Sequence, residues 1–537
     1  MENKKTKIIS IASIIALALT LVTATYAYFA SQTGEGKSTD IKINASTVDT
    51  FTFETGSALN LSLNQENFAS GKGNQTGTTF AKAMLTANNK TNTATEHYYM
   101  YLNISNNTFT YSIDNNTPEI LLTIKDGSNN EITSVSGLTY KTVTDGKGTS
   151  IKGFDITTKK GLVTILNNRE ITTTSSKTEE WNVTVTFVNY NSNQAGNAGK
   201  NFSAKLMIQK EKMPTVLSDV CTSGNNLATC ITTLSNKSEP SIVNIYHHTS
   251  SLANGAGDNS YRYAGASESV NNFVCFGSTT NPCPTDNLYR IIGVFDENYH
   301  GVTGKQLVKL IKYDYANSNL LGTDGDYYGS GTPSASYYKG SLTTINTYYW
   351  NNDAGINTWS TSLLNKTNLN TNFINNIGTT WANKIVTTTW KVGGNTYANI
   401  SESVSSTTYQ NEIVSPVATN STDNATTYSA KIGLMYASDY GFGAVPKAWT
   451  TTLMNYGGSV NGSTIRSQNW MHMGYYDWTI SRRSDVSSVA FGVNCYGVLF
   501  TRYDVRSYYG VRPSFNLEST VAYVSGSGSM SDPIRVN

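Results

Sequence analysis

The run Trp181-Asn182-Val183-Thr184-Val185-Thr186-Phe187 alternates apolar and polar side chains along its whole length. The first, third, fifth and seventh residues are apolar, and Asn or Thr stands between them. Successive side chains of a β-strand point to opposite faces, so this period of two predicts a strand with one buried face and one wet face. The run therefore indicates an antiparallel sheet with its core on one side.

Similar short runs recur through the N-terminal part of the chain, separated by turns rich in Asn, Gly, Lys and Ser. Short alternating strands at this spacing predict an all-β antiparallel sandwich, which we expect to occupy residues 31–212. No cluster of His, Cys or carboxylate residues stands out there, so we interpret this domain as a scaffold. The other runs are Thr50–Phe53, Tyr98–Ile104, Glu119–Ile124, Gly161–Leu166 and Ala204–Ile208.

The N-terminus has the pattern of an export signal. Three lysines within the first seven residues form a basic head, and Ile8 to Ala30 carries no charged side chain. Small residues near the end of this run suit a signal peptidase, and we expect cleavage after Ala27. The run is also long enough to cross the ~30 Å hydrocarbon core of a bilayer. Residues 1–30 are therefore either a signal peptide or a membrane anchor, and the rest of the chain is exported.

Composition narrows the function further. At 537 residues, two or three domains are expected. Only 14% of the residues are charged and the net charge is +2, so the chain lacks the basic patch that nucleic acid binding requires. The polar residues are mainly Asn, Ser, Thr, Gly and Tyr, which favour strands and turns. This composition is typical of a secreted, β-rich surface protein.

The five cysteines predict two local disulfides. Cys221 lies close to Cys230, and Cys275 lies close to Cys283. In an exported chain such pairs are candidate disulfides. Zinc is the competing interpretation, but the five histidines do not lie at ligand spacing from these cysteines. Cys495 is left without an obvious partner.

The C-terminal half predicts a second domain. Residues 213–260 are expected to form a linker with a short helix inside Leu217–Leu234. Within residues 261–537, Leu288–Phe295 and Leu307–Lys312 have the pattern of paired strands. Strands, one or two helices and long loops together indicate an α+β domain.

The signal and the sandwich pattern resemble the secreted fibre and camelysin-like proteins of Gram-positive bacteria. The residues that carry this resemblance are Thr25-Tyr26-Ala27-Tyr28-Phe29 and the alternating runs behind them. The resemblance implies a stalk or fibre-forming module and a specialised signal peptidase. No His-Glu-x-x-His motif occurs in the sequence, which argues against a peptidase role.

The C-terminal segment resembles C-type-lectin-like domains of bacteria, the group that includes relatives of sulfatase-modifying enzymes. Trp478-Thr479-Ile480-Ser481-Arg482 and Gly510–Leu517 carry the resemblance, which implies a closing strand of the Gly-x-Arg-Pro kind. The calcium-binding triplets of sugar-binding lectins are absent, and Trp350-Asn351-Asn352-Asp353 is a near miss. Calcium is therefore not expected. Because no second cysteine lies near Cys495, oxidase-type catalysis is not expected either.

The run Gly492–Tyr509 mixes Tyr, Phe, Arg, Asp, Val and Cys. Tyr and Arg supply much of the binding energy at protein interfaces, so this composition resembles that of an antibody paratope. The competing interpretation is an ordinary hairpin with core residues inside and Tyr outside. The run also resembles targets of diversity-generating retroelements, where adenine-directed mutagenesis rewrites Asn codons. That resemblance implies that the run is diversified and that Cys495 arose by diversification.

These patterns together predict an exported, adhesin-like binding protein that recognises an extracellular protein or glycan. No catalytic residues, cofactor or metal are expected, and the chain is not expected to be an enzyme. We expect Tyr503→Ala and Arg506→Ala to abolish ligand retention while stability changes by less than about 1 kcal/mol. The competing function is a structural fibre or matrix component that self-associates through the sandwich. The expected contacts are Tyr475, Tyr476, Tyr496, Phe500, Arg502, Tyr503, Asp504, Arg506 and Tyr508.

Overall fold

The computed structural model describes residues 49–63, 67, 72–88, 92–333, 336–416 and 425–537. The predicted signal or anchor at residues 1–30 lies outside this part of the chain. The protein divides into two compact units, and the boundary falls between Met213 and Pro214. Most of the regular structure in both units is β, in several antiparallel sheets.

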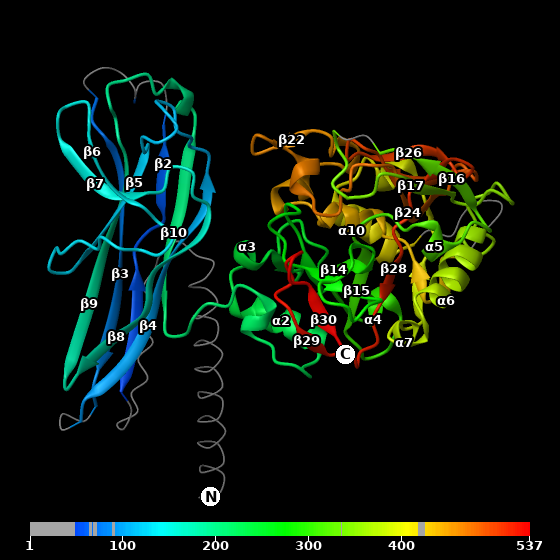
Figure 1. Cartoon of the computed structure of the whole chain (residues 1–537), viewed down its shortest axis with the longest axis horizontal. Coiled ribbons are helices and arrows are strands. Elements are labelled where there is room, and N and C mark those ends of the chain that lie inside the picture. Colours follow the sequence, from blue (N-terminus) through cyan, green and yellow to red (C-terminus); the bar gives the residue numbers. More distant parts are fainter. Residues whose placement is uncertain (1–48, 64–66, 68–71, 89–91, 334–335, 417–424) are drawn as a thin grey trace, which may run out of the picture. The chain divides into compact units, whose positions relative to one another are not determined.

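Unit 1 is an antiparallel β-sandwich, as the alternating runs predict (Figure 1). One sheet has the strand order β1-β3-β9-β5-β7-β6, and the other has the order β2-β10-β4-β8. The strands are β1 (Thr50–Thr55), β2 (Leu59–Ser62), β3 (Gln75–Thr86), β4 (Ala94–Asn107), β5 (Ile120–Asp126), β6 (Tyr140–Thr144), β7 (Ser150–Asp155), β8 (Gly161–Thr173), β9 (Ser176–Phe187) and β10 (Asn201–Gln209).

The run Trp181–Phe187 forms the second half of β9, a central strand that pairs with β3 on one side and β5 on the other. Its four apolar side chains are buried, whereas Asn182 is exposed and Thr184 is half-buried. Fully burying a Val or Phe side chain stabilises a fold by roughly 1.5 to 3 kcal/mol. The alternation of the sequence therefore fixes which face of the sheet meets the core.

Unit 2 is built on a nine-stranded sheet in which β21, β28, β15, β14, β13, β30 and β29 lie in that order. The predicted strands Leu288–Phe295 and Leu307–Lys312 are β14 and β15, and they pair antiparallel, which confirms the prediction. The other strands are β11 (Ile245–His247), β12 (Tyr261–Tyr263), β13 (Phe273–Cys275), β21 (Ile432–Gly433), β28 (Ser514–Asn516), β29 (Tyr523–Ser525) and β30 (Ile534–Val536).

Smaller sheets and short helices complete unit 2. The sheets are β16 (Tyr327–Gly331), β17 (Ile345–Tyr349) and β27 (Tyr508–Tyr509); β19 (Gly394–Asn395), β24 (Asp477–Arg483), β25 (Val489–Val493) and β26 (Leu499–Asp504); β18 (Thr388–Lys391) and β20 (Thr427–Ala430); and β22 (Ser459–Val460) and β23 (Ser463–Thr464). The helices include α2 (Leu227–Lys237), α3 (Pro240–Val243), α4 (Glu297–His300), α5 (Ser318–Leu321), η5 (Leu364–Phe373), α6 (Ile374–Asn376), α7 (Thr379–Ala382), α8 (Tyr397–Ile400), α9 (Ser405–Tyr409), η6 (Gln410–Val414) and α10 (Ala437–Phe442).

The segment expected to be a linker, 213–260, is instead part of unit 2 from Pro214 onward. Its helix, α2, begins after Asn226, whose side chain accepts a hydrogen bond from the Thr229 amide at 3.0 Å. Leu227 and Ile231 are buried in the same apolar core as β14 and β15. The correction follows from this burial, because a helix with an apolar face is stable only when that face is covered.

Both predicted disulfides are present, between Cys221 and Cys230 and between Cys275 and Cys283. Their Cα atoms lie 5.7 and 5.8 Å apart, within the usual range for this bond. Such bonds persist in oxidising compartments, so the chain is suited to an extracellular environment. Cys495 is the free thiol among the described cysteines.

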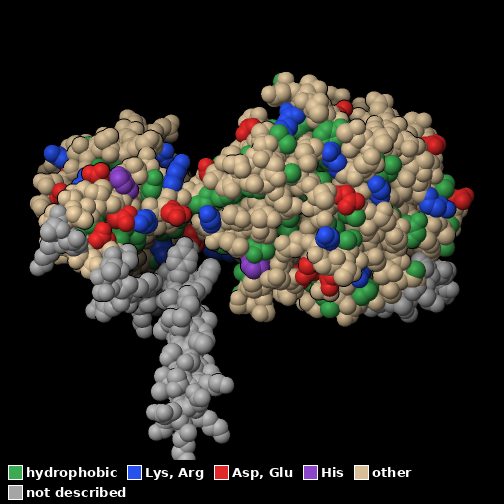
Figure 2. All heavy atoms as spheres, turned by 90° about the horizontal axis from the view of Figure 1, so that it is seen from below, with side chains coloured by type: hydrophobic (Ala, Val, Ile, Leu, Met, Phe, Trp, Pro, Cys, Tyr) green, Lys and Arg blue, Asp and Glu red, His purple; other side chains and the backbone are tan. Residues whose placement is uncertain are grey.

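The surface of the protein is largely neutral. Figure 2 shows Lys, Arg, Asp and Glu scattered singly or in small groups over a surface made mostly of uncharged polar groups and backbone. This distribution agrees with the low charged fraction of the sequence, 14%.

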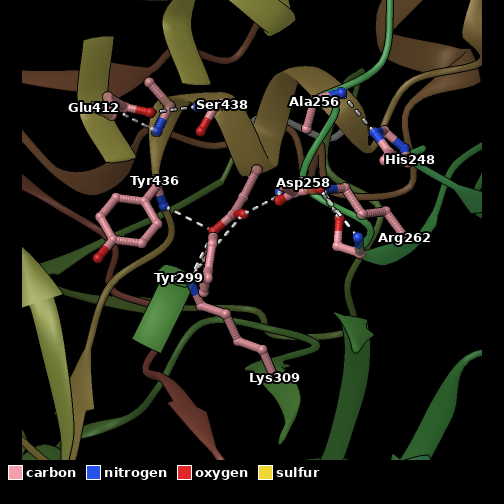
Figure 3. Close-up of polar contacts among 12 residues, drawn as sticks. His248, Ala256, Asp258, Arg262, Tyr299, Lys309, Glu412, Tyr436 and Ser438 are labelled. Carbon is pink, nitrogen blue, oxygen red and sulfur yellow. Dashed lines mark hydrogen bonds and ion pairs between the residues drawn. The ribbon is translucent and has the colours of Figure 1, made fainter. Parts of the chain in front are cut away.

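Charged groups are nevertheless buried inside unit 2: Lys309 and Arg262, labelled in Figure 3, pair with the buried Asp439 carboxylate. Lys309 Nζ lies 2.7 Å from Asp439 Oδ2, and the Tyr299 hydroxyl donates to the same carboxylate at 2.8 Å. Arg262 bridges the carboxylates of Asp439, at 3.4 Å, and Asp258, at 2.7 Å. Burial alone would raise the pKa of Asp258, but the Arg262 guanidinium and the hydrogen bond from Ser260, with smaller contributions, together lower the pKa to about 2. Two buried cations therefore neutralise the buried Asp439 carboxylate and the Asp258 carboxylate, whose side chain is 9% exposed.

The same aspartate caps α10. Its Oδ2 accepts a hydrogen bond from the Tyr436 amide at 3.1 Å. Beside it, the Glu412 carboxylate accepts from the amides of Ala437 and Ser438 and from the hydroxyl of Ser481 on β24. Carboxylates at a helix N-terminus are stabilised by its unpaired amides and dipole. The buried charges thus fix α10 against both the nine-stranded sheet and β24.

Removing one partner of this cluster should destabilise unit 2. We expect Lys309→Met to lower the free energy of unfolding by about 3 to 5 kcal/mol, because it leaves buried negative charge without its partner. Lys82→Met, which breaks the exposed Lys82–Glu180 pair, should cost less than about 1 kcal/mol. Urea unfolding followed by fluorescence measures the stability of both variants. Equal losses of unfolding free energy would contradict the stabilising role given to the buried cluster.

Candidate functional site

The predicted contact region is a pair of strand connections at one edge of unit 2. β25 turns into β26 through Asn494–Val498, and β26 turns into β27 through Val505–Ser507. β25 and β26 pair antiparallel, and β27 then pairs with β17, which is joined to β16. Figure 1 shows β16, β17, β24 and β26 gathered in one region of this unit. Segments far apart in the sequence therefore build a single surface.

The hairpin places alternate residues outward. Leu499, Tyr503 and Val505 are buried, whereas Phe500 and Asp504 are exposed. This is the period of two that a half-buried strand requires. Further along the run, Tyr496, Arg506 and Tyr508 are also exposed. The hairpin interpretation and the paratope interpretation are thus compatible, since the core side is ordinary and the outer side is aromatic and charged.

Three exposed and three half-buried tyrosines lie in this region, and we name them together the tyrosine face. The rings of Tyr328 and Tyr508 stack with centroids 3.6 Å apart and planes 11° apart, and Tyr349 meets Tyr328 edge to face at 5.4 Å. Tyr475 and Tyr476 contact each other at 5.8 Å. A Cβ added at Gly331 of β16 would lie 2.7 Å from the Tyr475 hydroxyl. The tyrosine face comprises Tyr328, Tyr349, Tyr475, Tyr476, Tyr496 and Tyr508.

Tyr503 lies beneath this face rather than on it, which corrects its place among the expected contacts. Only 9% of its surface is exposed, and its ring lies 4.5 Å from that of Tyr509 and 5.9 Å from that of Tyr476. Burial raises the pKa of Tyr509, in the same inner layer, to about 12. Tyr503 therefore belongs to the packed support of the surface.

The charged residues of the run lie at the margin. The Asp504 carboxylate accepts the Arg506 amide at 2.9 Å, which tightens the turn into β27. The Arg506 Nε lies 3.4 Å from the Asn352 carbonyl oxygen, and a Cβ at Gly355 would come within 2.2 Å of its guanidinium. The expected contact Arg502 lies on β26, but its side chain is outside the described part of the chain.

Cys495 and His472 lie at the base of the turn. Cys495 is half-buried, and its carbonyl oxygen lies 3.2 Å from His472 Nε2. Burial lowers the pKa of His472 to about 3, so the imidazole is neutral at physiological pH. A buried, neutral histidine bonded to backbone serves packing rather than proton transfer to a ligand.

Two tyrosines of the face, Tyr328 and Tyr349, were missed by the sequence reasoning. A signal was available, because Tyr-Tyr pairs recur in this half of the chain. On a strand, neighbouring residues point to opposite sides, so a pair supplies one ring to the core and one to the surface. In each pair here one ring is more buried than the other: Tyr327 is half-buried beside exposed Tyr328, Tyr348 is buried beside half-buried Tyr349, and Tyr509 is half-buried beside exposed Tyr508.

Comparison with known proteins adds no family assignment: no family model matches the chain, and no curated protein matches it. Among the described residues, no group of His, Cys, Asp and Glu has the geometry to hold a metal ion. In the same part of the chain, every helix is too short or too polar to span a bilayer. The choice of the tyrosine face as the candidate site therefore rests on its geometry alone.

Substitutions should separate the two layers. We expect Tyr503→Ala to lower the free energy of unfolding by about 3 kcal/mol, because it leaves a cavity among packed rings. Tyr508→Ala, on the surface, should change it by less than about 1 kcal/mol. Thermal or urea unfolding monitors both variants, and a larger loss for Tyr508→Ala would contradict this layering.

Proposed function

We propose that the protein is an exported, cell-surface binding protein that recognises a protein or glycan ligand through the tyrosine face. The observation that carries this proposal is the gathering of three exposed tyrosines, Tyr328, Tyr496 and Tyr508, with the half-buried Tyr349, Tyr475 and Tyr476 in one region of unit 2. Large aromatic groups exposed together on a soluble protein are typical of interaction sites. The two disulfides support export.

The chemistry of the face suits recognition. A tyrosine presents a large, rigid ring with few torsions to freeze and a hydroxyl that donates or accepts a hydrogen bond. Arg506 and Asp504 at the margin supply charged hydrogen bonds that orient a ligand. Because the rings stack on one another and rest on Tyr503 and Tyr509, the surface is preorganised, which lowers the entropic cost of binding.

The wider architecture in this proposal is a stalk carrying a recognition head. Unit 1 would be the stalk, with a signal of the camelysin-like kind before it. Unit 2 would be a C-type-lectin-like head, in which Trp478 and the segment Gly510–Leu517 take the positions of the framework strands. Support comes from their burial in the described structure, where Trp478, Val511 and Phe515 are all core residues.

Binding measurements test the proposal. On a glycan array and in a pull-down of cell-surface proteins, the full chain should retain a ligand that Tyr496→Ala and Arg506→Ala variants bind at least tenfold more weakly, a loss of about 1.4 kcal/mol or more. Met530→Ala serves as the control, because Met530 is equally exposed but lies in the β29–β30 connection, away from β26 (Figure 1). Equal retention by all variants would contradict the proposal.

Diversification of the hairpin is the second part of the proposal. The outward positions Tyr496, Phe500, Asp504, Arg506 and Tyr508 differ widely in chemistry, while the inward residues pack the core. Such positions tolerate change without loss of the fold. A near-copy of this gene segment, serving as the template, should therefore differ from the gene only where the template has adenine. Most of these differences should fall in the codons of the outward residues. Differences spread evenly over inward and outward codons, in a DNA comparison, would contradict it.

A further inference from the structure

Three polar side chains of unit 1 converge in a way that the proposed binding function does not use. Lys141 lies on β6, Asp155 ends β7, and Asn116 lies in the connection between β4 and β5. The Lys141 Nζ is 3.0 Å from Asn116 Oδ1 and 3.0 Å from Asp155 Oδ2. It also donates to the Asn116 carbonyl oxygen at 2.6 Å. The Lys141 amine thus lies within hydrogen-bond distance of both the Asn116 side-chain amide and the Asp155 carboxylate.

The backbone that carries Asn116 is held in place by its own connection. Asp114 Oδ1 accepts a hydrogen bond from the Asn116 backbone N–H at 2.7 Å, and Asp114 Oδ2 accepts one from the Thr117 hydroxyl at 2.8 Å. An aspartate turn of this kind restricts the backbone. Asn116 therefore meets the amine in a fixed position, which favours a reaction between them through proximity.

The carboxylate is also fixed and partly shielded. Asp155 Oδ1 accepts the Thr157 hydroxyl at 2.8 Å, and Oδ2 accepts the Tyr111 hydroxyl at 3.1 Å. The side chains of Asp155 and Lys141 are 6% and 23% exposed. Asn116 is exposed, so a small leaving molecule has a direct path to solvent.

We propose that Lys141 and Asn116 condense into an intramolecular isopeptide bond, with Asp155 moving the proton. Asp155 accepts a proton from the Lys141 ammonium, and the neutral Nζ attacks the Asn116 side-chain carbonyl carbon. A C–N bond forms to Nζ, and the C–N bond to Nδ2 breaks. Asp155 returns this proton to the departing nitrogen and passes on the second proton that Nζ loses as the amide forms, so that the nitrogen leaves as ammonium and Asp155 is a carboxylate again. No oxidant, metal or cofactor is consumed.

The product would fasten the β4–β5 connection covalently to β6, which is an edge strand of its sheet. Edge strands carry unpaired backbone groups and are the easiest to peel away. A covalent bond at this point prevents β6 and β7 from separating from the connection when the unit is pulled or heated. This suits the mechanical role of a stalk, but the bond itself does not depend on ligand binding.

Peptide mapping of the mature, full-length protein tests the inference. In the linked form, trypsin cannot cleave at Lys141, so Thr91–Lys125 and Asp126–Lys147 should appear as one species. The mass of this species should be lower, by the mass of one ammonia, than the sum of the masses of the two unlinked peptides. The link should be absent from Lys141→Arg, which keeps the ion pair but cannot form the amide.

The Asp155→Asn variant tests the role of the carboxylate. With unit 1 shown to be folded by its circular dichroism, this variant should keep both peptides separate. Complete recovery of Thr91–Lys125 and of Asp126–Lys141 as free peptides from the wild-type chain would overturn the inference. Linked peptides in the Asp155→Asn variant at the wild-type level would overturn the role given to Asp155.

Discussion

The cluster of buried charge around Asp439 is the constraint on which unit 2 depends. It joins β12 through Arg262, α4 through Tyr299 and β15 through Lys309. Because these charges are desolvated, they are tolerated only in this paired geometry. The core of unit 2 must therefore fold so that these charged side chains are paired, and other compact arrangements of the chain are disfavoured.

The tyrosine face inherits its rigidity from the same cluster. Asp439 caps α10, and the start of α10 is tied to Ser481 on β24 by the Ala437 amide, which lies 3.2 Å from the Ser481 hydroxyl oxygen. β24 follows directly on Tyr475 and Tyr476 and pairs with β25, which leads into the hairpin. The links from Asp439 to β24 are hydrogen bonds between buried groups, and the half-buried Tyr475 and Tyr476 precede β24 in the chain. A continuous path of contacts and chain therefore connects the core charges to the surface.

Features with a local cause were predictable from the sequence. The alternation in β9 reports its two faces directly, and β14 and β15 follow from apolar runs bounded by turns. The cysteine pairs are close in sequence, so their ends meet at little entropic cost. The outward tyrosines and charges of the hairpin were also largely identified, because their composition is unusual for a loop.

Features with a distant cause were not predictable. Tyr328 reaches the face only because β17 pairs with β27, and no local pattern shows that pairing. Tyr503 turns inward because of its register against Ala490 on β25, and a shift of one residue would have reversed it. The helix α2 was assigned to a linker because its partner surface lies elsewhere in the chain.

The packing of rings around Trp478 has an optical consequence. Its indole lies 4.7 Å from the Tyr509 ring and 6.1 Å from the Tyr503 ring, and rings at such separations exchange excitation energy efficiently. Light absorbed by these phenols should emerge as indole emission, so unit 2 carries a built-in donor and acceptor for fluorescence. A ligand that binds to the tyrosines above should therefore change the wavelength and quantum yield of this emission, so that binding can be followed without a label.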